Sequence, residues 1–143
     1  MLATQLQNLF IQYHQAFRKQ NIADALACYH FPCTLITPDR LVLLSNLKEA
    51  EQEFAQIFEG INNVNITSFK ALEASYESIN ENIIAVNVHW QFFDDNQEII
   101  ADFSALYHIL KNEQQFKIFQ VISHEVESSL NLSFPLNLTE TVE

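Results

Sequence analysis

A histidine and an aspartate on neighbouring predicted strands are the residues whose types and spacing best suit chemistry in this chain. If Asp95 and Asn96 form the centre of a two-residue turn, His89 lies opposite Asp102 in the resulting hairpin. A carboxylate beside an imidazole fixes the tautomer of the ring, which suits a general base. The alternative, which we favour, is a polar pair on the outer face of the sheet, exposed to water or at a subunit interface.

Other combinations of reactive side chains are less well arranged. The five histidines include no pair at the spacing of a helical metal site, and the predicted register places His108 and His124 on opposite faces, so no metal site is expected. The consecutive residues Ser123, His124 and Glu125 alternate across a strand and cannot form a triad. The single glycine excludes a glycine-rich phosphate loop, and we expect no cofactor.

Three long strands position these side chains. β-Branched and aromatic residues fill the runs 83–93, 99–110 and 116–124, and turn-forming residues separate the runs. This pattern predicts a long antiparallel meander. A one-residue slip of the first hairpin would place His89 opposite Phe103 and mix apolar with polar side chains on both faces, so that register is rejected.

One face of the predicted meander is apolar with a few polar interruptions. The expected cross-strand pairs of this face are Trp90–Ala101, Val88–Phe103, Phe103–His124, Ala105–Ile122, Tyr107–Gln120 and Ile109–Ile118. A cavity inside the fold would present the polar groups of this face to a ligand. The candidates for its wall are Trp90, Phe103, Tyr107, Gln120 and His124.

Three amphipathic helices and a hairpin are predicted before the meander. The helices span 3–19, 22–29 and 47–59, the hairpin pairs 33–37 with 41–44, and a further strand spans 64–78 with a bulge near Lys70 and Ala71. Asn46 and Glu49 fit a capping box for the third helix. Gly60, the only glycine, is expected to end that helix in a left-handed C-cap.

Three short motifs in these elements resemble those of a known superfamily. They are Tyr29-His30-Phe31-Pro32 before the first strand, Leu41-Val42-Leu43-Leu44 before the third helix, and Phe116-Lys117-Ile118 at the start of the last strand. The chain resembles the nuclear transport factor 2-like superfamily over about residues 3–125, although Phe116 stands where such families usually carry a tryptophan. The resemblance implies a single α+β domain over 1–125, with residues 126–143 as a loose tail or an extra edge strand.

The fold implied by the resemblance is a cystatin-like cone. Its antiparallel sheet is strongly curved, and the three helices of the N-terminal half cover the concave face and leave a pocket there. The resemblance adds Tyr13 and Tyr29 to the pocket candidates, because ketosteroid isomerases of this superfamily use a tyrosine as an oxyanion donor together with an acid. No acid is evident on the concave face, since Asp39 lies in a turn and Asp102 points outward.

The sequence therefore predicts a small-molecule pocket protein whose activity it does not assign. The ligand is expected to be small and apolar or amphipathic. One hypothesis is a cofactor-free isomerase, cyclase or dehydratase. The alternative is a non-enzymatic ligand-binding or dimeric association module, and fold alone does not decide between them.

The outer, convex face of the meander is expected to form a homodimer. It combines large apolar side chains with a polar surround, which is typical of an interface. The candidate interface residues are His89, Asp102, Leu106, His108, Phe119 and Val121.

Composition excludes several classes of partner. A net charge of −11 with seven Lys and Arg argues against nucleic acids and anionic membrane surfaces. No apolar run approaches the roughly 20 residues of a membrane span, and the N-terminal residues do not resemble a signal peptide, so a cytoplasmic location is expected. The two cysteines, Cys28 and Cys33, are expected to be buried reduced thiols, although a bridge between them is not excluded.

Overall fold

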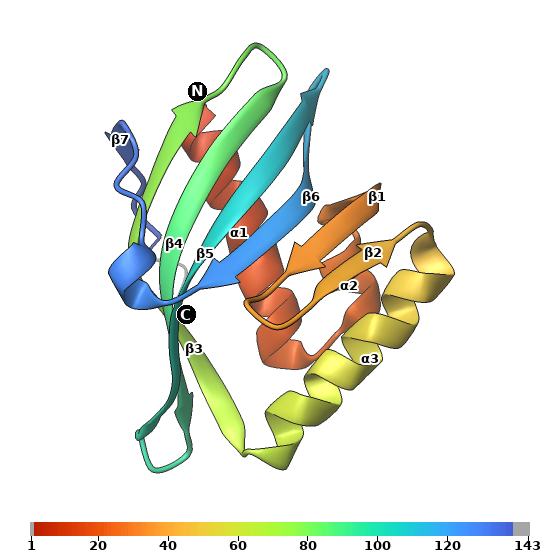
Figure 1. The fold of residues 1–143 in the computed structure, drawn as a ribbon, viewed down its shortest axis with the longest axis vertical. Coiled ribbons are helices and arrows are strands. Elements are labelled where there is room, and N and C mark those ends of the chain that lie inside the picture. The colour runs from red at the N-terminus through yellow and green to blue at the C-terminus, as the bar shows by residue number, and fades with distance from the viewer. Residues whose placement is uncertain (1, 139–143) are drawn as a thin grey trace.

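Three helices lie against one face of a seven-stranded sheet in a computed structural model that describes residues 2–138 (Figure 1). The helices are α1 (Leu2–Lys19), α2 (Ile22–Leu26) and α3 (Leu47–Asn63). The strands are β1 (Tyr29–Ile36), β2 (Leu41–Leu44), β3 (Ile66–Ser78), β4 (Ile83–Asp94), β5 (Ile99–Asn112), β6 (Gln115–His124) and β7 (Phe134–Pro135), with the short helix η1 (Val126–Ser128) before β7.

The strands follow the order β2-β1-β6-β5-β4-β3-β7. Only the β1–β6 pair is parallel, and the other neighbouring strands in the described residues are antiparallel. In Figure 1, α1 passes behind β5 and β6, and α3 lies beside the β1–β2 hairpin. The α+β fold with a largely antiparallel sheet, predicted above, is therefore confirmed. No helix within the described residues is both long and apolar enough to span a membrane.

The predicted cap of α3 is confirmed, but its predicted end is wrong. Asn46 Oδ1 accepts a hydrogen bond of 2.9 Å from the Glu49 amide, and the Glu49 carboxylate accepts one of 2.8 Å from the Ser45 amide. The helix continues through Gly60, whose φ is not positive. The left-handed residue is Asn65, with a φ of 61°, just before β3. Asparagine tolerates this conformation well, so glycine is not needed at the turn.

The register of the β4–β5 hairpin differs by two residues from the predicted one. The loop is longer than a two-residue turn, because Asp94 Oδ1 accepts hydrogen bonds of 2.9 Å from the Asn96 and Glu98 amides. A bulge between Phe92 and Phe93 adds a further shift. As a result Trp90 faces Phe103 instead of Ala101. A shift of two residues preserves the faces of a strand, so the predicted division into an apolar and a polar face still holds.

The β5–β6 hairpin follows the predicted register only as far as Ile109 and Ile118. Beyond them a bulge at Phe119 shifts the pairing, and Tyr107 faces Val121 instead of Gln120. An extra residue of this kind moves every later side chain of β6 to the opposite face. The β1–β6 ladder is irregular at the same level, between Tyr29 and Thr34. That segment includes Pro32, which has no amide hydrogen to donate.

The C-terminal segment is attached to the domain. β7 pairs with β3, and the Leu136 amide donates a hydrogen bond of 2.9 Å to the Ala74 carbonyl. Leu136 and Leu138 are buried, with 5% and 2% of their surfaces exposed, and belong to the main core. Of the two alternatives predicted for this segment, a loose tail or an extra edge strand, the structure shows the edge strand. Residues 139–143 lie outside the described part.

Replacing Phe10 with alanine should lower the free energy of unfolding by about 3–5 kcal/mol. The Phe10 ring is 1% exposed and packs edge-on against Tyr107, with centroids 5.0 Å apart. Phe134, which is 55% exposed, gives the matched control, and Phe134→Ala should cost about 1 kcal/mol or less. Chemical denaturation of both variants measures the difference, and equal losses would contradict this account of the core.

Candidate functional site

A cavity of about 320 Å³ lies between the helices and the concave face of the sheet. Helices α1 and α3, the β1–β2 hairpin and strands β3 to β6 all contribute side chains to its wall. The wall is largely aromatic, formed by Tyr13, Phe17, Tyr29, Phe54, Phe69, Trp90, Phe92, Phe103 and Tyr107. Aromatic side chains fill space in large rigid units. Because such rigid rings cannot adapt to every irregular space, a cavity can remain between the concave sheet and the two helices that cross it.

Two hydrogen bonds organise the polar groups of the wall. The hydroxyls of Tyr13 and Tyr29 are 2.8 Å apart and hydrogen-bonded. The indole N–H of Trp90 donates to the Tyr107 hydroxyl at 2.9 Å. All four residues are buried. These bonds fix the rings in place and satisfy groups that would otherwise be buried without a partner.

The three tyrosines are neutral hydrogen-bond donors. Burial raises the pKa of Tyr13 and of Tyr29 well above the ordinary value, and proximity of the other tyrosines adds to the shift for Tyr13. Burial likewise raises the pKa of Tyr107, against a smaller opposing effect of the Trp90 hydrogen bond. Phenolates are therefore disfavoured inside the cavity at neutral pH.

Two hydroxyl protons at the cavity have no acceptor among the described residues. A tyrosine hydroxyl carries one proton, so the acceptor in the Tyr13–Tyr29 bond keeps its own proton to donate elsewhere. Tyr107 accepts from Trp90 and also retains its proton. The wall can thus offer two neutral donors to an oxygen atom placed in the cavity.

His14 is a further polar residue of the cavity wall. Its Nε2 donates to the Phe69 carbonyl at 2.8 Å, because a carbonyl oxygen can only accept. Its ring stacks on Trp90, with an interplanar angle of 5°. The sequence analysis did not place His14 in the wall. Its spacing from Phe10 and Phe17, which share its helix face, was the signal that would have identified it.

A charged pair lines the rim of the cavity. Arg40, in the turn between β1 and β2, lies 3.6 Å from the Glu53 carboxylate of α3. The Arg40 side chain is 60% exposed and the Glu53 side chain is 14% exposed. The sequence analysis missed both residues, because a turn arginine and a helix glutamate look like ordinary surface residues. Only the fold brings them to the same opening.

The structure places five of the seven predicted pocket residues along the cavity and corrects two. Tyr13, Tyr29, Trp90, Phe103 and Tyr107 line it. Gln120 and His124 do not, because the bulge at Phe119 turns Gln120 outward. There Gln120 accepts from His108 Nδ1 at 2.8 Å and donates to Thr34 at 3.0 Å. His124 donates from Nδ1 to the Glu125 carbonyl at 3.2 Å. Val121 and Ser123 line the cavity in their place.

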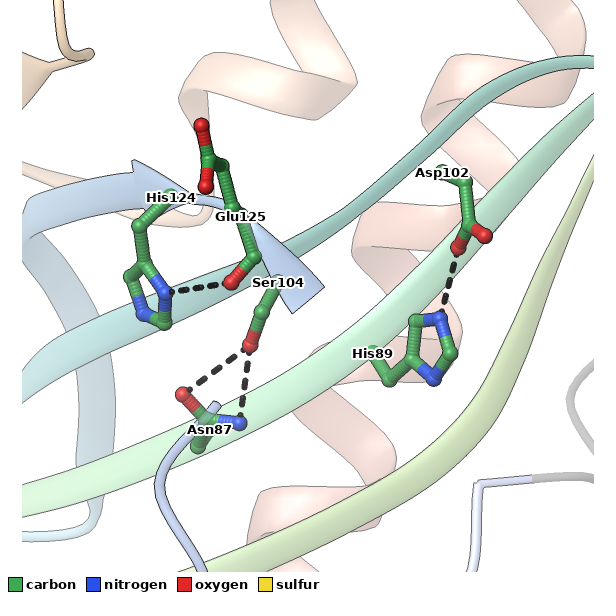
Figure 2. Close-up of polar contacts among 6 residues, drawn as sticks. All are labelled: Asn87, His89, Asp102, Ser104, His124 and Glu125. Atoms are coloured by element: carbon green, nitrogen blue, oxygen red, sulfur yellow. Dashed lines mark hydrogen bonds and ion pairs between the residues drawn. The ribbon is translucent and has the colours of Figure 1, made fainter. Parts of the chain in front are cut away.

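The outer face carries the predicted contact between His89 and Asp102, in a shifted register. Figure 2 shows His89 bonded to Asp102 and Asn87 bonded to Ser104, on the side of the sheet away from the helices. The His89 Nε2 atom lies 2.7 Å from Asp102 Oδ1. His89 lies directly opposite Ser104 in the ladder, so its contact with Asp102 is diagonal. His89 also borders a second hollow of about 720 Å³ beneath the tail segment 129–138.

The predicted interface set needs one correction. Val121 is turned inward by the bulge at Phe119, and it is 8% exposed and part of the core. Leu106 and His108 are half-buried on the outer face, and the Phe119 ring stacks on His108 with centroids 6.1 Å apart. Ile122, which faces Leu106 across the ladder, takes the place of Val121 in the outer apolar patch.

The described residues contain neither a thiol with a lowered pKa nor a cluster of metal ligands. Cys28 and Cys33 are free and buried, as expected from the sequence. Burial raises the pKa of Cys28 to about 12 and that of Cys33 to about 11, so both thiols stay protonated at neutral pH. Within residues 2–138, no three histidine, cysteine or acidic side chains gather as metal ligands would.

The sequence from residue 4 to residue 126 matches the model of a protein family described as "NTF2-like protein (DUF6841)". The chain belongs to this NTF2-like family. The match spans α1 to the start of η1 and leaves out the C-terminal segment. No protein with a curated description matches the sequence.

Solved structures share the fold of this NTF2-like protein at low sequence identity. An NTF-2 like protein of unknown function from Shewanella oneidensis superposes with a TM-score of 0.69 at 10% identity, covering 86% of this chain and 98% of that one. A domain with a cystatin-like fold from Nostoc punctiforme gives 0.67 at 15% identity, covering 90% and 76%. A ketosteroid isomerase-like protein from Erwinia carotovora gives 0.53 at 14% identity, covering 83% and 92%. At these identities the likeness establishes the fold alone.

The three cavity tyrosines should resist ionisation in the folded protein. Their pKa values are raised above the ordinary value of about 10, so the folded state keeps protons that the unfolded chain loses. Their contribution to stability is complete below about pH 10 and is lost as the pH rises above it. Tyrosinate absorbance should show at least three of the four tyrosines protonated at about pH 11, with the melting temperature falling from pH 10 upward. Full ionisation of a still-folded protein would contradict this.

Proposed function

We propose that this NTF2-like protein binds a compact, largely apolar molecule inside the cone and holds an oxygen atom of that molecule through tyrosine hydroxyls. The observation that carries the proposal is the aromatic cavity of about 320 Å³, whose wall contains the three hydrogen-bonded tyrosines. Small-molecule sites in proteins are typically apolar hollows of roughly 300–1,000 Å³ with a few placed polar groups.

The chemistry of the donors selects the kind of ligand group. A neutral hydroxyl donates to a carbonyl, ether or hydroxyl oxygen, and burying it without an acceptor costs roughly 1–3 kcal/mol. Such a ligand oxygen would supply the acceptor that the described residues do not provide. The aromatic walls bury the rest of the ligand and supply most of the binding free energy.

The competing proposal is an enzyme that transfers protons without a cofactor, as an isomerase, cyclase or dehydratase would. It is supported by the presence of Glu53 and His14 in the same wall, since proton transfer needs a base near the ligand. It is also consistent with the isomerase-like description of one structural neighbour. His14 is less suited to the role, because its ring is 2% exposed and its Nε2 is bonded to a backbone carbonyl.

A bicyclic ketone such as 2-tetralone should bind the cavity and change the fluorescence of Trp90. Trp90 is the only tryptophan of the chain and lines the cavity, so the signal reports this site. Ala105→Phe should fill the cavity and weaken binding at least tenfold, because Ala105 lies in the wall between Phe103 and Tyr107. Ala55→Phe, on the exposed face of α3, is the matched control and should bind as the unmodified protein does.

The same ligand separates binding from catalysis. Isothermal titration that detects no binding, or binding that Ala105→Phe leaves unchanged while the variant stays folded, would contradict a cavity site. Deuterium uptake at the carbon beside the ketone in heavy water, abolished by Glu53→Gln, would favour the enzyme. Binding without protein-dependent deuterium uptake would favour the non-enzymatic protein.

We also propose that two copies associate through the outer face of β5 and β6. Leu106, Phe119 and Ile122 are only half-buried there and lie beside polar side chains, as in many interfaces. A symmetric contact of this kind buries roughly 1,200–2,000 Å² in total. Light scattering should show a dimer that Leu106→Glu converts to monomers, whereas Leu130→Glu in the exposed tail leaves it intact. A monomeric unmodified protein would contradict the proposal.

A further inference from the structure

Glu53 is a nearly buried carboxylate that receives no hydrogen bond from the described residues. Its side chain is 14% exposed and lines the cavity. Its ion-pair partner, Arg40, lies 3.6 Å away, beyond hydrogen-bond distance for a nitrogen and an oxygen. A carboxylate can accept several hydrogen bonds, and a buried one is stabilised when donors fill those positions. The Glu53 carboxylate therefore has acceptor positions that a donor at the rim of the cavity could fill.

Arg40 is poorly placed to supply that donor permanently. It is 60% exposed and belongs to the turn between β1 and β2, so it can swing into water at little cost. Ion pairs between exposed side chains contribute little to stability. A small cationic group with N–H donors could thus replace Arg40 at the rim and donate a hydrogen bond to the Glu53 carboxylate at a shorter distance.

The rest of the site favours a cation over an anion. Among the described residues that line the cavity, Glu53 is the only carboxylate, and a ligand carboxylate held by Arg40 would lie beside it and be repelled. The chain has a net charge of −11, which attracts cations and repels anions over longer distances.

We infer that the cavity selects ligands that carry a protonated amine at their outer end, with Glu53 as the residue that determines this specificity. The inference rests on the proposed binding function and adds the charge of the ligand to it. The apolar body of the ligand fills the aromatic cavity, and its ammonium group donates to the Glu53 carboxylate at the rim. Arg40 then turns toward solvent. Both ends of the ligand are thereby specified: neutral tyrosine donors within the wall and an acidic acceptor at the opening.

Three ligands of one shape test the inference with the whole chain. They are 6-hydroxy-2-aminotetralin, which is a cation at neutral pH, 6-hydroxytetralin-2-carboxylate, which is an anion, and 6-hydroxy-2-tetralol, which is neutral. Each carries a phenolic oxygen at the far end for the tyrosine donors, so only the group at the rim differs. Isothermal titration should give an affinity for the amine about tenfold above that for the alcohol, and weaker binding for the carboxylate. All three should compete for one site, with quenching of Trp90 as the second readout.

Two rim variants separate the roles of the charges. Glu53→Gln keeps the shape of the side chain and should remove the preference for the amine while leaving binding of the alcohol within about twofold. Arg40→Met should strengthen amine binding, because Glu53 loses a competing cation. Glu51→Gln, at an exposed position of α3, removes the same charge away from the cavity and should preserve the preference.

The outcomes test the specificity role of Glu53 separately from the proposed binding function. If the alcohol binds but the amine binds no better, or if Glu53→Gln keeps the preference, the inference is wrong while the proposed binding function survives. If the carboxylate binds best and Arg40→Met abolishes its binding, Arg40 is the specificity residue and the inference is overturned. If none of the three ligands binds, the proposed function itself fails. A circular dichroism spectrum of each variant confirms that it is folded.

Discussion

Strand β6 forms hydrogen bonds with two neighbouring strands that run in opposite directions. The way in which it pairs with both determines which of its side chains line the cavity. It runs parallel to β1 and antiparallel to β5, and both ladders are irregular around Phe119. The β1 segment opposite that point contains Pro32, which cannot complete a regular ladder. The extra residue turns Val121 toward the helices and Gln120 outward. One bulge thus supplies an apolar residue to the cavity and completes the outer chain of hydrogen bonds through His108, Gln120 and Thr34.

The cavity stays open because its polar groups hold the aromatic rings apart. Trp90 is fixed by its bond to Tyr107, and His14 by its bond to the Phe69 carbonyl. A ring that moved to fill the space would break one of these bonds in an apolar setting, where an unpaired polar group is costly. Burial, and not these bonds, keeps the tyrosines neutral, since the Trp90 bond lowers the pKa of Tyr107. Burial penalises the phenolate, so the residues that shape the cavity are also its hydrogen-bond donors.

The sequence predicted the elements of the fold and the faces of β4 and β5 well, because periodicity and turn chemistry are local signals. The bulge expected near Ala71 is present between Ala71 and Glu73, and the Asn46 cap forms. The registers failed where loop geometry and bulges decided them, since the alternation in β6, unlike that in β3, did not lead to a prediction of the extra residue at Phe119. The rim pair Arg40 and Glu53 had no sequence signal at all. Those residues are brought together by tertiary packing of a turn against a helix, which residue spacing does not encode.

If the proposed binding holds, the difference between the two ends of the cavity gives this NTF2-like protein a physical basis for discriminating between ligands. Neutral hydroxyls in an apolar wall favour an oxygen acceptor and tolerate no charge, because a buried ion without a partner costs far more than a neutral group. The rim is different, since Glu53 borders both the cavity and solvent and can hold a charged group that stays partly hydrated. A ligand with its polar groups reversed would place a charge among the aromatic rings and leave Glu53 without a donor. The orientation of the proposed ligand would therefore be fixed by two unfavourable alternatives as much as by the favourable contacts.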